Sequence, residues 1–231
     1  MKIAVINFSG NVGKSTVAKH LLAPRLPNAE FIAVESINAD ENDTDMIRGK
    51  QFGHLQERMV TLNSAIVDIG ASNVEDFISL MRAYRGSHED FDYYLVPAVK
   101  ESKQIKDTIA TIQALADMDI PANKIRVIFN KLEVDETLED VFYPLISFYK
   151  DKKLYLLNKN AVLHYSEIYQ RLRSFRLTIP DLLNDHTDYK IIAKHTSDVN
   201  EKSHAITMVS LKRLAISAKE NLDSVYNNVI N

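Results

Sequence analysis

The stretch that decides the fold is the amino terminus, which reads MKIAVINF at 1–8, SGNVGKST at 9–16 and VAKHLL at 17–22. The first segment is an apolar run with β-branched residues, typical of a buried strand, and the third has helical character. The turn between them contains two glycines and ends in Gly-Lys-Ser-Thr. Strand, loop and helix in this order form a phosphate cradle, because the loop amides and the helix N-terminus point at one anion. The segment therefore predicts a binding site for a nucleoside triphosphate.

The residues of this loop are assigned roles from that geometry. Lys14 is expected to reach the β- and γ-phosphates, and the Ser15 hydroxyl is expected to bind Mg²⁺. The remaining candidates for nucleotide contact are Ser9, Gly10, Asn11, Val12, Gly13 and Thr16. The usual P-loop pattern has a further glycine where this chain has Phe8, so the motif is incomplete. An ordinary strand–turn–helix connection with a surface lysine is the alternative.

The composition is that of an ordinary globular protein, with 231 residues of which 45% are hydrophobic and 26% charged. We expect a single domain over 1–231, with carboxyl-terminal helices at about 198–229 packed on it. No apolar run approaches the ~20 residues of a membrane span. No secretory signal is recognisable and cysteine is absent, which together favour a cytoplasmic protein. The net charge of −3 gives no general case for nucleic-acid binding.

Apolar runs alternate with helical patterns along the chain. Strands are expected after the first one at 31–34, 65–69, 93–99, 125–129 and 154–157. Helical spacing occurs at 17–22, 74–84, 102–118, 164–175 and 203–229. This alternation predicts an α/β fold, in which a mainly parallel, twisted sheet has helices on both faces. Such a sheet binds its ligand at the carboxyl ends of the strands.

A second element of the phosphate site is predicted at the end of the strand 65–69. Asp68 would place a carboxylate where the phosphates lie and would hold Mg²⁺ through a water molecule, because this ion keeps part of its hydration shell. Gly70 would leave room for its amide to approach the γ-phosphate. Taken alone, an apolar run that ends in aspartate usually marks only the end of a strand. Combined with the loop, it predicts a magnesium site made by Ser15 and Asp68.

With these motifs the chain resembles the ParA/MinD group of deviant Walker-motif P-loop ATPases, and more narrowly the StbB-type plasmid-stability proteins. The residues that carry the resemblance are 3–5, 10–16, 66–70, 95–98 and 126–131. The resemblance covers roughly 1–160. It implies slow hydrolysis of Mg-ATP, a nucleotide-dependent homodimer, and contacts with DNA or a DNA-binding adaptor protein in plasmid stability or segregation.

The chain departs from this group at two loop positions. The signature lysine of the group corresponds to Ser9, and the second glycine corresponds to Asn11. In relatives the lysine reaches the phosphates of the partner subunit across an ATP-sandwich dimer. Its replacement leaves three alternatives open for this chain, namely a weaker dimer, a differently bridged dimer or no dimer.

The resemblance also implies roles for residues outside the phosphate cradle. It places the catalytic aspartate in the acidic stretch 35–45, where Asp40 is the first candidate and Glu35 the second. It assigns Asn130 to the adenine base, with Lys131 packing along that base. From its position after the strand expected at 154–157, Asn158 is a candidate to close over the base from the other side.

Three alternatives remain open from the sequence. Residues 130–133 read Asn-Lys-Leu-Glu, close to the Asn-Lys-x-Asp that binds guanine in GTPases, so GTP is an alternative to ATP. The arginines in 171–176 could contact DNA phosphates or form a solvated helix face. Two alternative functions also remain. The chain could be a nucleotide-binding module without catalysis, or a P-loop kinase or ligase that acts on a small molecule.

Overall fold

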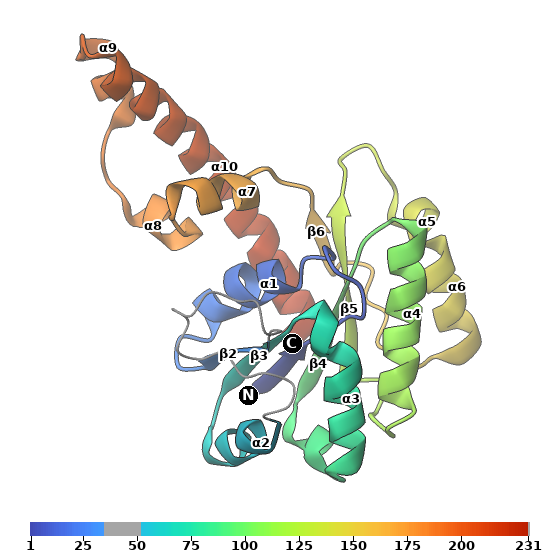
Figure 1. The fold of residues 1–231 in the computed structure, drawn as a ribbon. Coiled ribbons are helices and arrows are strands. Elements are labelled where there is room, and N and C mark those ends of the chain that lie inside the picture. Colours follow the sequence, from blue (N-terminus) through green and yellow to red (C-terminus); the bar gives the residue numbers. More distant parts are fainter. Residues whose placement is uncertain (35–51, 231) are drawn as a thin grey trace.

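The computed structural model describes residues 1–34 and 52–230. Its centre is a six-stranded sheet in the order β2-β3-β1-β4-β5-β6, with every pair of neighbouring strands parallel (Figure 1). The strands are β1 (Lys2–Val5), β2 (Glu30–Val34), β3 (Ala65–Ile69), β4 (Tyr93–Ala98), β5 (Ile125–Leu132) and β6 (Val162–His164). The central strands are nearly continuous apolar runs because helices cover both of their faces. The α/β fold with a parallel sheet, predicted from the sequence, is confirmed.

Two hydrophobic cores lie on the two faces of the sheet. Alternate residues of β1 show the division, since Ala4 packs in one core while Ile3 and Val5 pack in the other. The first core is covered by α2 (Phe52–Thr61), α3 (Val74–Ala83), α4 (Ser102–Ala116), α5 (Leu138–Val141) and α6 (Tyr143–Lys152). The second is covered by η1 (Val17–Leu22), α7 (Ile168–Phe175), α8 (Ile179–Asn184) and α10 (Val199–Ile230).

The helices expected at 74–84 and 102–118 form close to their expected bounds, as α3 and α4. In α3, Val74, Phe77, Ile78 and Met81 are buried against the sheet, which is the spacing of one helical face. Glu75 and Asp76 lie in the first turn of this helix, where negative charge is favoured by the helix dipole.

No strand forms at 154–157, so that prediction is wrong. Leu156 forms only an isolated bridge with Arg126, through a hydrogen bond from its amide to the Ile125 carbonyl. The chain then turns at Asn158 and pairs with β5 as β6, eight residues later than Leu154. As a consequence, the helix expected from residue 164 begins at Ile168 as α7.

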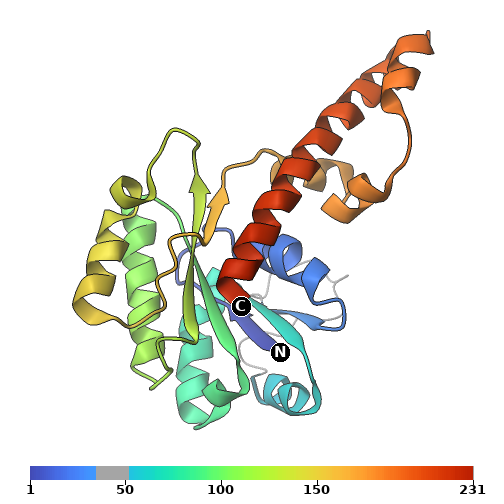
Figure 2. The same ribbon diagram turned by 180° about the vertical axis from the view of Figure 1, so that it is seen from behind.

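The carboxyl-terminal helix α10 is one continuous helix of 32 residues. Its carboxyl-terminal part packs in the second core through Leu222, Val225 and Val229. Its amino-terminal part extends away from the sheet together with α9 (Tyr189–His195), as both views show (Figures 1 and 2). Among the described residues, no helix combines the length and apolar character that a membrane span requires.

Candidate nucleotide-binding site

The loop at 9–16, called the P-loop from here on, connects β1 to the helix that begins at Lys14 as α1 (Lys14–Thr16) and continues as η1. Asn11 and Gly13 have left-handed backbones, with φ of 60° and 94°. Left-handed residues within a turn bring successive amides to one side, and this forms a concavity that suits an anion. Asparagine is one of the few non-glycine residues that adopt this conformation readily, which explains how Asn11 replaces a glycine.

Lys14 lies in this concavity and is 8% exposed. Its Nζ donates hydrogen bonds to the carbonyl oxygens of Asn7, at 3.0 Å, and Ser9, at 2.7 Å. Burial lowers the pKa of Lys14 to about 8, and the negative charge of Asp68 partly offsets this effect. The ammonium group is thus held by the loop itself, at the place where the sequence predicts a phosphate.

Asp68 occupies the end of β3, next to β1 in the sheet. It is 5% exposed, and it is in register with Val5, the last residue of β1. The buried carboxylate therefore lies beside the start of the P-loop. In the part of the chain that the structure describes, no group of three or more His, Cys, Asp or Glu side chains is placed to hold a metal ion. A magnesium ion does not require one, because it retains several waters and takes only one or two protein ligands. The hydroxyl of Ser15 and the carboxylate of Asp68 are oxygen ligands of the kind that this ion takes.

The amide of Gly70 is already engaged in the structure. It donates a hydrogen bond of 2.7 Å to the carbonyl of Val34, at the end of β2. The side chain of Asn73 donates to the same oxygen at 3.3 Å. The predicted contact of Gly70 with a γ-phosphate would therefore require this amide to leave Val34.

Asn130 and Lys131 connect the end of β5 to the P-loop. Asn130 donates from Nδ2 to the Val12 carbonyl at 2.8 Å and accepts at Oδ1 from the amide of Lys131 at 2.9 Å. Lys131, with φ of 60°, donates from Nζ to the Asn11 carbonyl at 3.0 Å. Both ends of the Asn130 amide are thus occupied in shaping the loop, a role that sequence reasoning missed, while its predicted contact with the base stays a prediction.

Gly13 is required by this arrangement for a second reason besides its φ. A Cβ at this position would lie 2.2 Å from Nδ2 of Asn130. Only glycine therefore permits Asn130 to approach the loop so closely.

A cavity of about 360 Å³ adjoins the P-loop. It is lined by Gly13 and Thr16 on one side, by Asn130 and Lys131 at the end of β5, and by 164–167 and 169–170 together with Arg173. Its volume lies in the range of small-molecule sites. It is also at the carboxyl edge of a parallel sheet, where such folds bind ligands.

The structure does not bring Asn158 to this cavity. Its Nδ2 donates to the carbonyl of Asn228 at 2.8 Å, near the end of α10. The connection that follows β6, at 165–167, lines the cavity instead, because β6 and not 154–157 is the last strand. Tyr169 and Gln170 also line it and were missed, since their position depends on the true start of α7. Asp40 and Glu35 lie outside the described residues.

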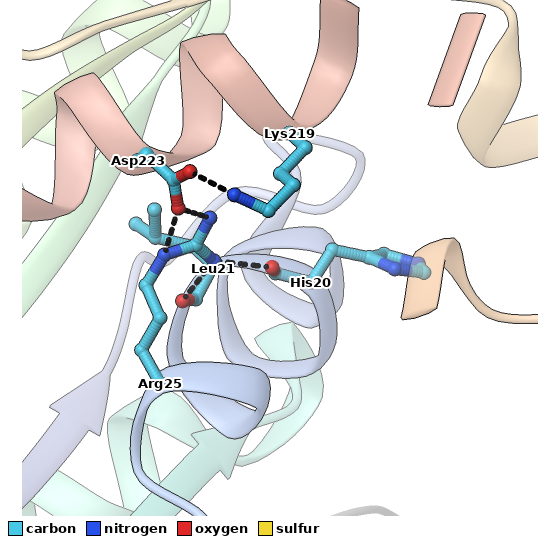
Figure 3. Close-up of polar contacts among 5 residues, drawn as sticks. All are labelled: His20, Leu21, Arg25, Lys219 and Asp223. Carbon is cyan, nitrogen blue, oxygen red and sulfur yellow. Dashed lines mark hydrogen bonds and ion pairs between the residues drawn. The ribbon is translucent and has the colours of Figure 1, made fainter. Parts of the chain in front are cut away.

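The far end of the P-loop helix is attached to α10 (Figure 3). Pro24 has no N–H and cannot donate to the carbonyl of His20, four residues earlier. Arg25 supplies donors, from Nη1 to the carbonyls of His20 at 3.1 Å and Leu21 at 2.9 Å. Its Nε and Nη2 both contact Oδ1 of Asp223 on α10.

No protein-family model matches the chain. No curated protein matches it. Among solved structures, the cell-division protein MinD of Aquifex aeolicus is similar with a TM-score of 0.51 and 14% identity, covering 94% of this chain and 97% of MinD. The chain has the fold of MinD. The MinC:MinD complex of the same organism gives a TM-score of 0.52 at 13% identity, covering 94% of this chain and 96% of that chain. A Cyanothece McdA variant in complex with ATP gives 0.51 at 13% identity, covering 96% of each chain. These likenesses confirm the predicted P-loop NTPase fold.

Proposed function

We propose that the chain is a ParA/MinD-like nucleotide switch, which binds Mg-ATP, hydrolyses it slowly and so controls its contacts with DNA or a partner protein. The observation that carries the proposal is the P-loop concavity, with Lys14 inside it, Asp68 beside it and a cavity of nucleoside size adjoining it. ATP and a partner protein are supported by the similar solved structures, because McdA is found with ATP and MinD with MinC. The role in plasmid stability or segregation rests on the sequence resemblance.

Each residue of the site has a separate role in binding Mg-ATP. Lys14 and the amides of the P-loop bind the phosphates, and the hydroxyl of Ser15 and the carboxylate of Asp68 hold Mg²⁺. This ion would neutralise part of the charge that develops on the phosphates. Asn130 holds the loop in its binding conformation. The cavity takes the ribose and base.

Hydrolysis and dimerisation are the finer parts of the proposal. Asp40, with Glu35 as the second candidate, is the residue expected to orient the attacking water. Ser9 cannot replace the signature lysine of the ParA/MinD group, because it is 5% exposed and its amide donates to Oδ1 of Asn7 within the loop. A nucleotide-dependent homodimer of this chain would need other contacts across the phosphates.

The first test is the Lys14→Ala variant, titrated with ATP and Mg²⁺ in a calorimeter. We expect the loss of detectable ATP binding, because a phosphate in the concavity would no longer meet a cation. Lys103→Ala is the control, since Lys103 is an exposed lysine on α4 that belongs neither to the P-loop nor to the lining of the adjoining cavity. Unchanged affinity in the Lys14→Ala variant would show that the P-loop assignment is wrong.

The second test concerns hydrolysis. Asp40→Ala is expected to bind ATP normally but to lose hydrolysis in a single-turnover assay. An unchanged rate would remove Asp40 from its role and direct attention to Glu35. Turnover with ATP alone, compared with turnover in the presence of DNA, separates a regulated switch from a module that binds nucleotide without catalysis.

A further inference from the structure

A second cavity, of about 380 Å³, adjoins the candidate nucleotide site. It lies between the P-loop helix and α7, and Thr16, Tyr169 and Arg173 line both cavities. The nitrogen-bearing side chains around it come from two separate segments, 19–20 on η1 and 173–176 at the end of α7: Lys19, His20, Arg173 and Arg176.

The lining of this cavity carries positive charge without a compensating carboxylate. No Asp or Glu occurs among its described lining residues. Arg173 and Arg176 form no ion pair or side-chain hydrogen bond with any residue in 1–34 or 52–230. Arg171 on the same helix behaves differently, because it pairs with Glu167 at 3.6 Å and donates to Oγ of Ser210 at 3.4 Å. The two cavity arginines thus keep their donors available.

The pKa of His20 is lowered in part by the same positive charges. Burial, the largest cause, and the charges of Lys19 and Arg173 together lower the pKa of His20 to about 4. The ring also contacts Tyr169, with centroids 5.3 Å apart, which fixes it at the cavity wall. The positive charges of Lys19 and Arg173, which disfavour a proton on His20, favour an anion at the same place.

We propose that this cavity binds a small phosphorylated ligand in addition to the nucleotide at the P-loop. Arginine is suited to this because its planar guanidinium donates two parallel hydrogen bonds to phosphate oxygens. A concave site of this volume suits a small ligand. Duplex DNA, in contrast, is bound by basic surfaces that follow its backbone, and this chain has a net charge of −3.

The test uses inorganic pyrophosphate as the probe and calorimetry as the measurement. The chain carries Lys14→Ala, so that binding at the P-loop does not obscure the second site. We expect one pyrophosphate per chain, and a loss of about tenfold or more in affinity when Arg173→Gln or Arg176→Gln is added. Arg171→Gln is the matched control, because it removes the same charge from the same helix but lies outside the cavity lining.

The proposal is overturned if pyrophosphate does not bind, or if Arg171→Gln weakens binding as much as Arg173→Gln. It is also overturned if the two cavity arginines are needed for binding duplex DNA but not for binding pyrophosphate. Thermal melts of each variant verify folding, which we expect to persist because Arg173 and Arg176 are exposed. The arginine variants are also compared in the chain that keeps Lys14. This control shows whether Lys14→Ala itself disturbs the second cavity.

Proton NMR of His20 gives an independent measurement. Bound pyrophosphate should raise the pKa of His20, since the anion offsets the charges of Lys19 and Arg173. An unchanged His20 pKa at saturating pyrophosphate would contradict the site. Because both measurements are made on a chain without Lys14, a failure of the nucleotide proposal would leave them interpretable.

Discussion

Replacement of Gly13 by alanine tests the proposed construction of the P-loop. Gly13 has φ of 94°, and a Cβ there would lie 2.2 Å from Nδ2 of Asn130. Asn130 is 5% exposed and is held by its hydrogen bond to the Val12 carbonyl. The new methyl group must therefore displace the Asn130 side chain and break that bond.

The expected cost has two parts. An alanine in the left-handed region costs about 1–2 kcal/mol. Loss of the Asn130–Val12 hydrogen bond costs about 1 kcal/mol. Gly13→Ala should therefore lower the free energy of unfolding by about 2–3 kcal/mol. Asn130→Ala alone loses the same hydrogen bond, so the sum of the two single variants counts it twice. The double variant should be less destabilised than that sum by about 1 kcal/mol.

Urea denaturation followed by far-UV circular dichroism measures these values, and tyrosine fluorescence gives a second signal because the chain has no tryptophan. Gly10→Ala is the control within the same loop. A Cβ at Gly10 would meet no atom within 4 Å, and its φ is outside the left-handed region, so we expect a change below about 0.5 kcal/mol. Additivity of Gly13→Ala and Asn130→Ala within about 0.5 kcal/mol would refute the proposed coupling.

Three further predictions concern charged residues at the site and at the far end of the P-loop helix. The pKa of Lys14 is lowered to about 8, and phosphate binding needs the protonated form of this lysine. The affinity for ATP should therefore fall as the pH rises above about 8, by at most about tenfold per pH unit. An equal fall in the Lys14→Arg variant would contradict this prediction. Asp68→Asn should bind ATP with little benefit from Mg²⁺, measured by titrations with and without the ion; an undiminished magnesium effect would exclude Asp68 as a ligand. Arg25→Met should lower the free energy of unfolding in urea by about 2 kcal/mol, because it removes the hydrogen bonds to two helix carbonyls and to Asp223. Lys219→Met, which removes only a more exposed pairing with Asp223, should cost below about 1 kcal/mol, and an equal loss in both would contradict the role of Arg25.

The fold could be predicted from the sequence because its signals are local. Buried parallel strands such as 65–69 are short apolar runs, and α3 carries its apolar residues on one helical face. The last strand was misplaced because 154–157 and 162–164 are both short apolar segments. Pairing with β5 decides between them, and pairing is a tertiary property.

The site was predictable to the extent that its residues adjoin one another in sequence. The P-loop and the end of β3 are of this kind. The role of Asn130 was not predictable, because its partner Val12 is 118 residues away and the contact depends on the left-handed backbone of the loop. An asparagine that shapes the loop and an asparagine that contacts the base would both follow the same strand in the sequence. The sequence pattern therefore does not distinguish the two roles.

The attachment of α10 gives the molecule a lever arm. Its base is fastened to the helix that starts at Lys14, through Arg25 and Asp223, while its opposite end stands clear of the sheet (Figures 1 and 3). About 24 residues of α10 separate Asp223 from the outer end at Val199, a length of about 36 Å, so a tilt of about 5° at Asp223 would displace the tip by about 3 Å. A small motion at the phosphate cradle would thereby be larger at the outer end of the molecule.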